Sequence, residues 1–526
     1  MYYPLTVQDF LDRAEHVYPD RTGIVDEPDQ PAPPLPALTY REIAEHARAQ
    51  AAFLDSLDVP VGGRVAVISQ NSSRLFTSFF GVPAYGRILV PINFRLARPE
   101  IEYIVSHSGA DVVYADPSLK DALDTLDVKH RFLLGDDESM FLHGVEPRPW
   151  DRPDEAATAS INYTSGTTAR PKGVQLTHRN LWLNAVVFGM HTTISDRDVY
   201  LHTLPMFHCN GWGMPFAMTG VGAKHVVLRQ IDGSEILRRV DEHGVTLMCA
   251  APAVLNAVLD ALPSWQGEVP GRDRVRVVCA GAPPPSRTIQ RVIDDLGWEF
   301  IQIYGLTETS PLLTINRGRA EWDGLPSIER ARRLSRAGVP ALGVQIKVDS
   351  TGELLAATNH NLDGYWNQPE ETARAQAGGW FHTGDGGVVD DEGYVVISDR
   401  KKDVIISGGE NVSSIEVEDA LMSHPAVREV AVIGIPDDTW GELVTALVVT
   451  DGSEATADDL IAHCRTRLAG LQVPEAGRLR RAPRADRHRQ AAEVQAARAL
   501  LVRAHPQGQL NRRRARTPAV SAPAAA

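Results

Sequence analysis

The chain has 526 residues, more than one hydrophobic core usually holds, which predicts two or more domains. Its net charge of −14 argues against a nucleic-acid-binding protein, and no apolar run reaches the ~18 residues that span a bilayer. The four cysteines show neither CxxC nor zinc spacing, and the N-terminus lacks the features of a signal peptide, so we expect reduced thiols in a cytoplasmic protein.

Short apolar runs alternate with amphipathic stretches along most of the chain. The pattern predicts helices over residues 40–57 and 234–243, and buried strands over residues 64–69, 111–114, 225–228 and 275–279. Strands that alternate with helices indicate a layered α/β architecture with parallel sheet. A smaller α+β unit follows a charged, hinge-like stretch at 399–403. For it we predict helices over 416–423 and 455–468 and strands over 429–435 and 443–450.

One polar loop joins two apolar strands between residues 159 and 176. It reads Thr164-Ser165-Gly166-Thr167-Thr168-Ala169-Arg170-Pro171-Lys172-Gly173. Small residues let backbone N–H groups approach an anion closely, while hydroxyls and a lysine add donors and positive charge. The ordinary P-loop pattern fails, because Gly166 is followed by five residues and then Lys172-Gly173. The loop predicts a polyphosphate site, with a polar surface turn as the alternative.

Three further strings combine residue types that bind nucleotides or carboxylates. The first, residues 205–212, contains His208 and Trp212, although a structural histidine among core residues is its plainer interpretation. The second, residues 303–309, follows the turn 280–283. It offers Tyr304 to stack on a purine and Glu308 to reach phosphate or Mg²⁺, with a solvated strand end as the alternative.

The third string, residues 380–385, ends in Asp385, an acidic residue of the type that holds ribose hydroxyls in dinucleotide enzymes. The run Asp399–Asp403 and the turn Gly408-Gly409 come next. A charged run alone is typical of a solvated surface. Its place directly before a Gly-Gly turn, in order with the other motifs, is what favours a functional role.

In this order the motifs resemble those of the acyl-adenylate-forming superfamily, which includes acyl-CoA synthetases, luciferases and peptide-synthetase adenylation domains. The resemblance covers residues 5–470. The 205–212 string is similar to the aromatic-His motif at the carboxylate pocket of fatty acyl-CoA synthetases. The resemblance implies an N-terminal domain over residues 1–399, built from two α/β subdomains plus a small β-barrel. It also implies a small mobile α+β C-terminal domain over residues 400–470, which is truncated here.

The resemblance also assigns roles to single residues. Thr164, Lys172, His208, Glu308 and the hinge residue Lys402 would be catalytic, His208 and Trp212 would line the carboxylate pocket, and Glu308 would bind Mg²⁺. ATP and CoA would contact Thr164, Ser165, Gly166, Thr167, Thr168, Lys172, Gly281, Ala282, Tyr304, Gly305, Thr307, Asp385, Arg400, Gly408 and Gly409.

The implied reaction is ATP-dependent ligation of a carboxylate to coenzyme A through an acyl-AMP intermediate, with a medium- or long-chain fatty acid as substrate. An aryl-CoA ligase and an impaired acyl- or nucleotide-binding pseudoenzyme stay open as alternatives. The sequence also leaves the oligomeric state open, a homodimer included.

The segment from Leu471 to Ala526 differs in kind from the rest of the chain. It holds twelve Arg, no Lys and three acidic residues, whereas the remainder holds 41 basic and 64 acidic residues. The segment reads as a disordered basic tail. No lysine follows Lys402, so the lysine that the family carries near its C-terminus, in a Pro-x-Thr-x-x-Gly-Lys-like motif, is missing.

The genetic code offers an account of this tail. Codons permitted for residues 485–491, read from their second base, give Pro-Thr-Ala-Thr-Gly-Lys, and the same offset turns residues 471–476 into Phe-Lys-Cys-Pro-Lys. We therefore hypothesise a shift of reading frame near Gly470, with poor adenylation by the chain as written. A genuine basic tail and a coincidence of degenerate codons are the alternatives.

Overall fold

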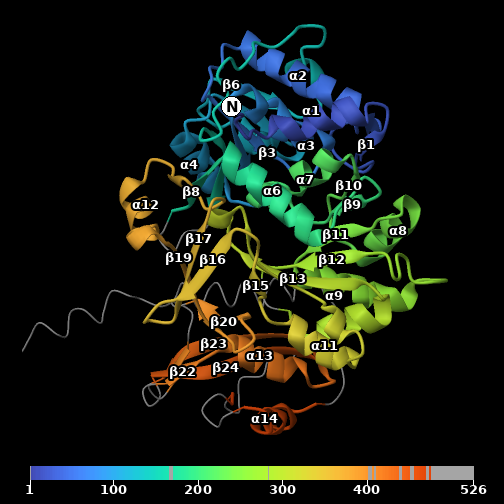
Figure 1. Cartoon of the computed structure of the whole chain (residues 1–526), viewed down its shortest axis with the longest axis vertical. Coiled ribbons are helices and arrows are strands. Elements are labelled where there is room, and N and C mark those ends of the chain that lie inside the picture. The colour runs from blue at the N-terminus through green and yellow to red at the C-terminus, as the bar shows by residue number, and fades with distance from the viewer. Residues whose placement is uncertain are drawn as a thin grey trace, which may run out of the picture. The chain divides into compact units, whose positions relative to one another are not determined.

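The computed structural model describes residues 2–164, 170–281, 284–400, 405–407, 410–437, 441–450, 455–468 and 473–474. The chain divides into two compact units, residues 1–397 and 398–526 (Figure 1). Among the described residues, no helix is long and apolar enough to cross a membrane.

A seven-stranded sheet forms the first layer of the larger unit. Its strand order is β18-β8-β7-β4-β3-β5-β6, parallel from β7 to β6, whereas β7 and β8 form an antiparallel hairpin. The strands are β3 (Arg64–Ile68), β4 (Ile88–Ile92), β5 (Val112–Ala115), β6 (His130–Leu133), β7 (Thr158–Thr164), β8 (Lys172–Thr177) and β18 (Gly364–Tyr365).

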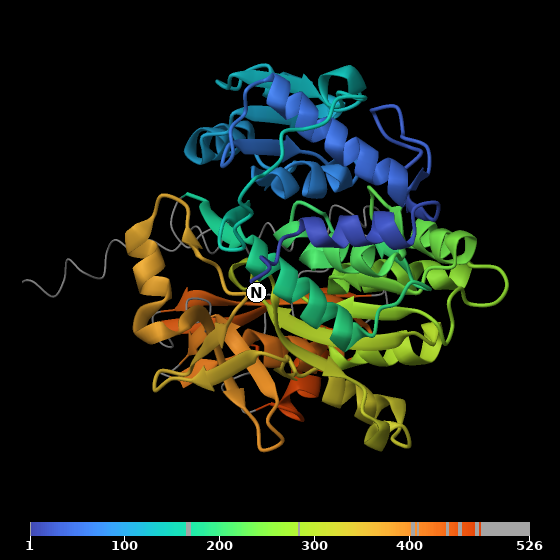
Figure 2. The ribbon, with the colours of Figure 1, turned by 45° about the horizontal axis from the view of Figure 1, so that its top comes forward.

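The central strand β3 explains why its sequence is a continuous apolar run. Val65 and Val67 pack with α2 (Tyr40–Ser56) and α3 (Ser73–Gly81), whereas Ala66 and Ile68 pack on the other face with α4 (Arg98–Ser108). Both faces of the strand are therefore buried, as is usual in parallel sheets. Figure 2 shows the blue helices of this part of the chain packed around its strands.

A nine-stranded sheet forms the second layer, with the order β15-β14-β13-β12-β11-β9-β10-β1-β2. Its strands from β13 to β1 are parallel. They are β1 (Thr22–Val25), β2 (Leu38–Thr39), β9 (Val199–His202), β10 (Lys224–Val227), β11 (Leu247–Ala250), β12 (Arg276–Cys279), β13 (Glu299–Gly305), β14 (Leu312–Arg317) and β15 (Val339–Pro340). Helices α8 (Gly233–His243) and α9 (Pro252–Ala261) pack into the same core as β10, β11 and β12.

The predicted helices and strands of this unit agree with α2, α8, β3, β5, β10 and β12 to within one residue at each end. Local signals account for such agreement. The start of α2, for example, is set by a capping box in which the Thr39 side chain accepts from the Glu42 backbone while Glu42 accepts from the Thr39 backbone.

A four-stranded sheet stands where the resemblance implied a small β-barrel. It contains β16 (Val344–Val348), β17 (Glu353–Thr358), β19 (Phe381–Val389) and β20 (Val395–Arg400), in that order. The short helix α12 (Pro369–Ala375) lies between β18 and β19 in the chain and packs against both. This sheet carries the predicted ribose-binding residue, Asp385, on β19.

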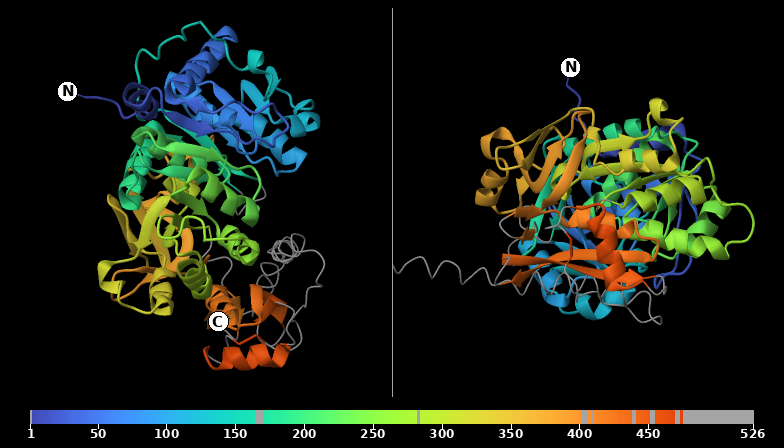
Figure 3. Two further views of the ribbon diagram at one scale, coloured as in Figure 1. Left: turned by 90° about the vertical axis from the view of Figure 1, so that its right-hand side faces the viewer. Right: turned by 90° about the horizontal axis from the view of Figure 1, so that it is seen from below.

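The smaller unit is an α+β fold with its own hydrophobic core. Its sheet has the order β22-β21-β24-β23, and α13 (Ser414–Met422) packs against β23, as Figure 3 shows. The remaining elements are β21 (Ile405–Ser407), β22 (Glu410–Val412), β23 (Val427–Asp437), β24 (Gly441–Thr450) and α14 (Ala457–Arg465). The core joins α13, the sheet and α14 through Leu421, Val432, Val444 and Leu460. The predicted tail lies outside the described residues, except for 473 and 474.

Candidate active site

The β7–β8 hairpin presents the predicted phosphate loop. Thr164 and Lys172 are cross-strand partners at the open end of the hairpin, so the loop between them starts and ends at one place. A side chain at Gly173 would place a Cβ 2.8 Å from Ile161 Cγ2 and 3.0 Å from Tyr163 Cζ. Glycine has no Cβ and avoids this crowding. The loop residues Ser165, Gly166, Thr167 and Thr168 lie outside the described part of the chain.

Lys172 is held by an acidic partner from α12. Its Nζ lies 2.5 Å from Glu371 Oε2, and only 15% of its side chain is exposed. The same ammonium lies 5.1 Å from the centroid of the Tyr365 ring, within the range of a cation–π contact. Burial lowers the pKa of the Lys172 amine, with Glu308 acting in the opposite direction.

Glu308 sits in a short turn of helix just after β13 and meets the same tyrosine. Tyr365 Oη donates to Glu308 Oε1 at 2.9 Å, and the Leu362 backbone N–H donates to the Glu308 carbonyl at 2.6 Å. Burial and then the Glu308 charge raise the pKa of Tyr365, which keeps its hydroxyl a donor. Tyr365 therefore contacts both residues that we expect to handle phosphate and Mg²⁺.

The predicted adenosine-binding residues also meet one another. Tyr304 Oη donates to Asp385 Oδ2 at 2.8 Å, and Asp385 is buried, with 5% of the residue exposed. Gly281 follows β12, and Tyr304 lies near the carboxyl end of its parallel neighbour β13, so both are at one edge of the sheet. A Cβ on Gly305 would lie 1.6 Å from the Pro311 carbonyl oxygen, so this turn also requires glycine.

The predicted carboxylate-pocket string forms a left-handed turn. Positive φ angles run without interruption from Cys209 to Gly213, between 46° and 78°. His208, just before the turn, is exposed, yet the surrounding protein still lowers the pKa of its imidazole by desolvation. The Trp212 side chain is 5% exposed and belongs to the same apolar cluster as Met214 and Met218.

A small network of amides ties this turn to the strand that leads into the phosphate loop. Asn162 Nδ2 donates to Asn210 Oδ1 at 3.1 Å, and Asn210 Nδ2 donates to Ser160 Oγ at 2.8 Å. Ser160 Oγ in turn donates to Asn162 Oδ1 at 3.0 Å. All three residues are buried, so the network fixes the position of the turn relative to β7.

Buried Asn71 holds the start of the segment that leads from β9 to this turn. Its Nδ2 group donates to the carbonyls of His202, Leu204 and Leu228 at 2.9, 2.8 and 3.1 Å, and its Oδ1 accepts from the Met206 backbone at 2.7 Å. One side chain thus joins the ends of β9 and β10 to the loop that carries His208.

Several predicted positions cannot be placed. Ala282, Lys402, Gly408 and Gly409 lie outside the described residues, and Arg400 is described only as the last backbone position of β20. Across the described ranges, no three His, Cys, Asp or Glu side chains group as metal ligands. A single carboxylate such as Glu308, completed by substrate phosphates and water, is the arrangement that Mg²⁺ commonly uses.

The sequence reasoning missed four residues that the structure places at the site. Tyr365 and Glu371 lie almost two hundred positions from Lys172, and no local pattern connects them to it. Asn162 and Asn210 carried a usable signal, because a polar amide inside an apolar strand or core string needs a buried partner.

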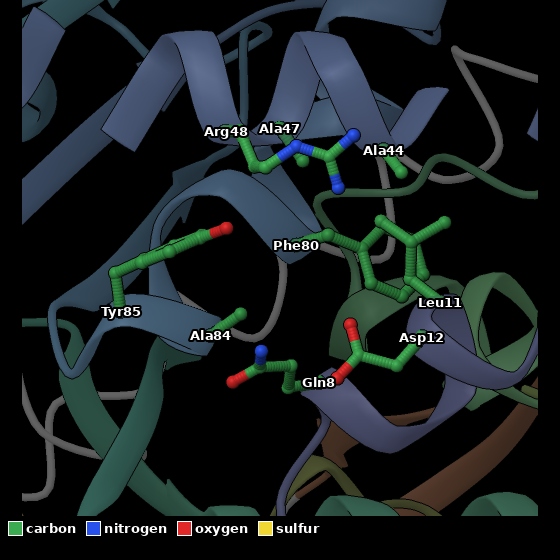
Figure 4. Close-up of a pocket in the computed structure, with 9 residues that line it drawn as sticks. All are labelled: Gln8, Leu11, Asp12, Ala44, Ala47, Arg48, Phe80, Ala84 and Tyr85. Carbon is green, nitrogen blue, oxygen red and sulfur yellow. The ribbon is translucent and has the colours of Figure 1, made fainter. Parts of the chain in front are cut away.

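A small pocket lies between α1 (Gln8–Val17) and α2 and contains no predicted site residue. Figure 4 shows Asp12 and Gln8 on one side of it, facing Tyr85 and Arg48. Arg48 makes two hydrogen bonds of 2.9 Å to Glu15. Burial, followed by the charges of Asp9 and Glu15, raises the pKa of Asp12 to about 6.

Comparison with known proteins gives consistent matches along the chain. Residues 11–366 match the AMP-binding enzyme family, and residues 416–487 match the AMP-binding enzyme C-terminal domain. The second match therefore continues past Gly470.

Two curated relatives are CoA ligases. The 4-hydroxybutyrate–CoA ligase 2 of Metallosphaera sedula is 35% identical, over 90% of this chain and 91% of its own. A 2-methylpropanoate–CoA ligase of Humulus lupulus is 36% identical over the same shares.

Two solved structures share the fold. The anthranilate CoA ligase AuaEII, in complex with anthranoyl-AMP, has a TM-score of 0.81 at 25% identity, covering 94% of this chain and 98% of its own. The O-succinylbenzoate CoA synthetase of Bacillus subtilis, in complex with ATP and magnesium ion, has a TM-score of 0.75 at 26% identity, covering 91% and 96%.

Proposed function

Since the chain belongs to the AMP-binding enzyme family, we propose that it is an ATP-dependent acyl-CoA ligase that uses ATP, Mg²⁺ and coenzyme A. The observation that carries the proposal is the convergence of four predicted nucleotide residues into two contacting groups. Tyr304 bonds to Asp385, and Lys172 and Glu308 share Tyr365.

The reaction has two steps. A carboxylate oxygen attacks the α-phosphorus of ATP, the bond to the β-phosphate oxygen breaks, and acyl-AMP and pyrophosphate form. The CoA thiol then attacks the acyl carbon, AMP leaves with the bonding electrons, and the thiol proton is lost. AMP is a far better leaving group than the oxide that a free carboxylate would have to expel.

The first step places negative charge on phosphate oxygens, so its catalysis depends mainly on positioning and on cations. Lys172 would meet the polyphosphate, Glu308 would hold Mg²⁺, which supplies charge neutralisation when bound, and Asp385 would accept from the ribose hydroxyls. His208 would orient the carboxylate. Rotation of the small unit about Lys402 would then admit CoA, which is a known way of running two half-reactions in one site.

For the acyl group, we propose a medium- or long-chain fatty acid, on the strength of the 205–212 string. A short-chain acid is the second candidate, favoured by the names of the two relatives that are 35% and 36% identical. Initial rates of AMP formation with butyrate, 2-methylpropanoate, octanoate, palmitate and benzoate, each with and without CoA, separate these candidates. A preference for octanoate or palmitate supports the first, a preference for the branched or four-carbon acids replaces it with the second, and a preference for benzoate indicates an aryl-CoA ligase.

We also propose that the tail from Leu471 is the product of a shifted reading frame, which removes the C-terminal lysine. Loss of one preorganised donor to a developing oxyanion costs about 10²–10³ in rate. Pyrophosphate release should therefore be far slower than in a frame-restored chain, while conversion of supplied acyl-AMP by CoA should be less affected. Equal rates of pyrophosphate release, or the tail recovered as peptides from cells together with an unshifted gene sequence, would contradict the proposal.

A further inference from the structure

We infer that the Glu371 carboxylate of α12 pairs with Lys172 when ATP is absent and with Arg374 alone when ATP is bound. This exchange of partners would control when Lys172 can bind the polyphosphate of ATP. The inference rests on the proposed function, since it supposes that ATP binds beside Lys172. Glu371 and Arg374 lie beyond residues 11–366, the stretch that matches the AMP-binding enzyme family.

The first observation is that Lys172 is already neutralised in the structure. Its ammonium lies 2.5 Å from Glu371 Oε2, and both side chains are largely shielded from solvent, with 15% and 26% exposed. Taken without Arg374, this ion pair has no net charge to offer an anion. A tetravalent nucleotide that approached it would meet the Glu371 carboxylate as well as the lysine.

The second observation is that Glu371 has another partner ready. Arg374, one helical turn along α12, donates from its NH2 group to Glu371 Oε1, the carboxylate oxygen that does not face Lys172. The arginine is 70% exposed and anchored to nothing else that the described contacts show, so it can follow the carboxylate. If Lys172 turns to phosphate, Glu371 therefore keeps a cation and is not left as an unpaired, partly buried charge.

The third observation is that the chain fixes α12 beside the hairpin. β18 pairs with β8 through Gly364 with Gln175 and Tyr365 with Val174, and the Trp366 backbone N–H donates to the Gly173 carbonyl at 2.7 Å. The Tyr365 backbone N–H donates to Thr372 Oγ1 at 2.9 Å, which ties the helix to the strand. Figure 1 shows α12 beside β8. Glu371 is thus held near Lys172 by backbone contacts that do not depend on the ion pair.

Isothermal titration of the full-length chain with ATP and Mg²⁺, in the absence of a carboxylate, tests the exchange. Glu371→Gln should tighten ATP binding by roughly threefold to tenfold, because Lys172 no longer has to leave a carboxylate. Arg374→Gln should weaken ATP binding by about threefold, because Glu371 then holds Lys172 alone. The adjacent, exposed Glu370→Gln is the matched control and should change the affinity by less than about twofold.

Two further arms isolate the mechanism. AMP lacks the β- and γ-phosphates, so its affinity should be the same in all variants. In a Lys172→Met background, Glu371→Gln should no longer tighten ATP binding, because the partner that it released is gone. Thermal melts of each variant confirm that all are folded, and Glu371→Asp, which keeps the charge but shortens the reach, should lie between wild type and Glu371→Gln.

The outcomes separate this inference from the proposed function. A wild-type chain that binds neither ATP nor AMP contradicts the function itself. A wild-type chain that binds both, with Glu371→Gln no tighter for ATP than wild type, contradicts the exchange alone. An equal shift for ATP and AMP also overturns it, because the effect would then not involve the terminal phosphates.

Discussion

The two ends of the proposed nucleotide site differ in how their charged groups are paired. At the adenosine end, a neutral donor, the Tyr304 hydroxyl, bonds to the buried carboxylate of Asp385. At the phosphate end, the cation Lys172 bonds to the anion Glu371, so a phosphate would meet a lysine that already has a counter-ion.

The difference follows from what each end must bind. A carboxylate has about four lone-pair positions, so Asp385 can keep Tyr304 and still accept from two ribose hydroxyls. A lysine that is partly buried without a counter-ion is costly, so the protein supplies one and a phosphate has to replace it. On this proposal the adenosine end is preorganised, whereas the phosphate end exchanges partners.

The largest effect should come from Lys172→Met. The change removes the cation that we place at the polyphosphate, and we expect kcat/KM for ATP to fall by about 10²–10³. Steady-state pyrophosphate release measures it. If the loss is below about tenfold, Lys172 is not an important phosphate ligand and the contrast between the two ends disappears.

Asp385→Asn should have the next largest effect and should act mainly on binding. Loss of charge-assisted hydrogen bonds to the ribose costs roughly 1.5–3 kcal/mol, which corresponds to an increase of about 10–100-fold in the KM for ATP. The Tyr304→Phe variant is the matched control, since it leaves the carboxylate in place and should raise the KM less. Equal effects of the two variants would mean that the pair acts as one structural unit.

Tyr365→Phe should have a smaller effect that appears at the phosphate end only. It deletes one hydrogen bond to Glu308 and keeps the ring beneath Lys172, so the expected cost is about 1 kcal/mol, or roughly fivefold in the KM for MgATP. The affinity for AMP should be unchanged. A comparable loss of AMP binding would show that Tyr365 supports the whole site.

The smallest effect should come from Asp12→Asn, in the pocket between α1 and α2. The pKa of Asp12 is raised to about 6, so its stabilising contribution is present below the unfolded pKa near 4 and is lost as pH rises through 6. Although the protein around the carboxyl group desolvates it in part, Asp12 as a whole is exposed, and the solvent screens the effect. We therefore expect the variant to gain less than about 1 kcal/mol of unfolding free energy at pH 7.5 and nothing at pH 4. Denaturant titrations at both pH values measure it, and an altered KM for ATP would link this pocket to the nucleotide site.

Much of the scaffold could be predicted because it is locally encoded. Parallel strands that are buried on both faces, such as β3, read as apolar runs, and caps such as Thr39 with Glu42 mark helix starts. Gly173 and Gly305 stood out as members of the nucleotide motifs, and the structure adds the atoms that crowd a side chain at each.

The counter-charges at the site could not be predicted in the same way. Glu371 reads as an ordinary acidic residue in the first turn of a short surface helix, where glutamate is favoured in any case. Its contact with Lys172 depends on β18 pairing with β8, a long-range register that no local pattern specifies. The charges that surround Lys172 are therefore set by tertiary structure and not by local sequence.

If the 205–212 string lines the acyl pocket as proposed, the left-handed turn from Cys209 to Gly213 limits how that pocket can be engineered. Each non-glycine residue in that conformation costs roughly 1–2 kcal/mol, so a saturation library at Asn210 and Gly211 should return mainly glycine and asparagine. Productive diversity should come instead from the residues packed around the turn, such as Phe188 and Met218 in the cluster that holds Trp212. A library directed at Phe188 and Met218 keeps the turn intact while it changes the shape of the apolar cluster that packs against the turn.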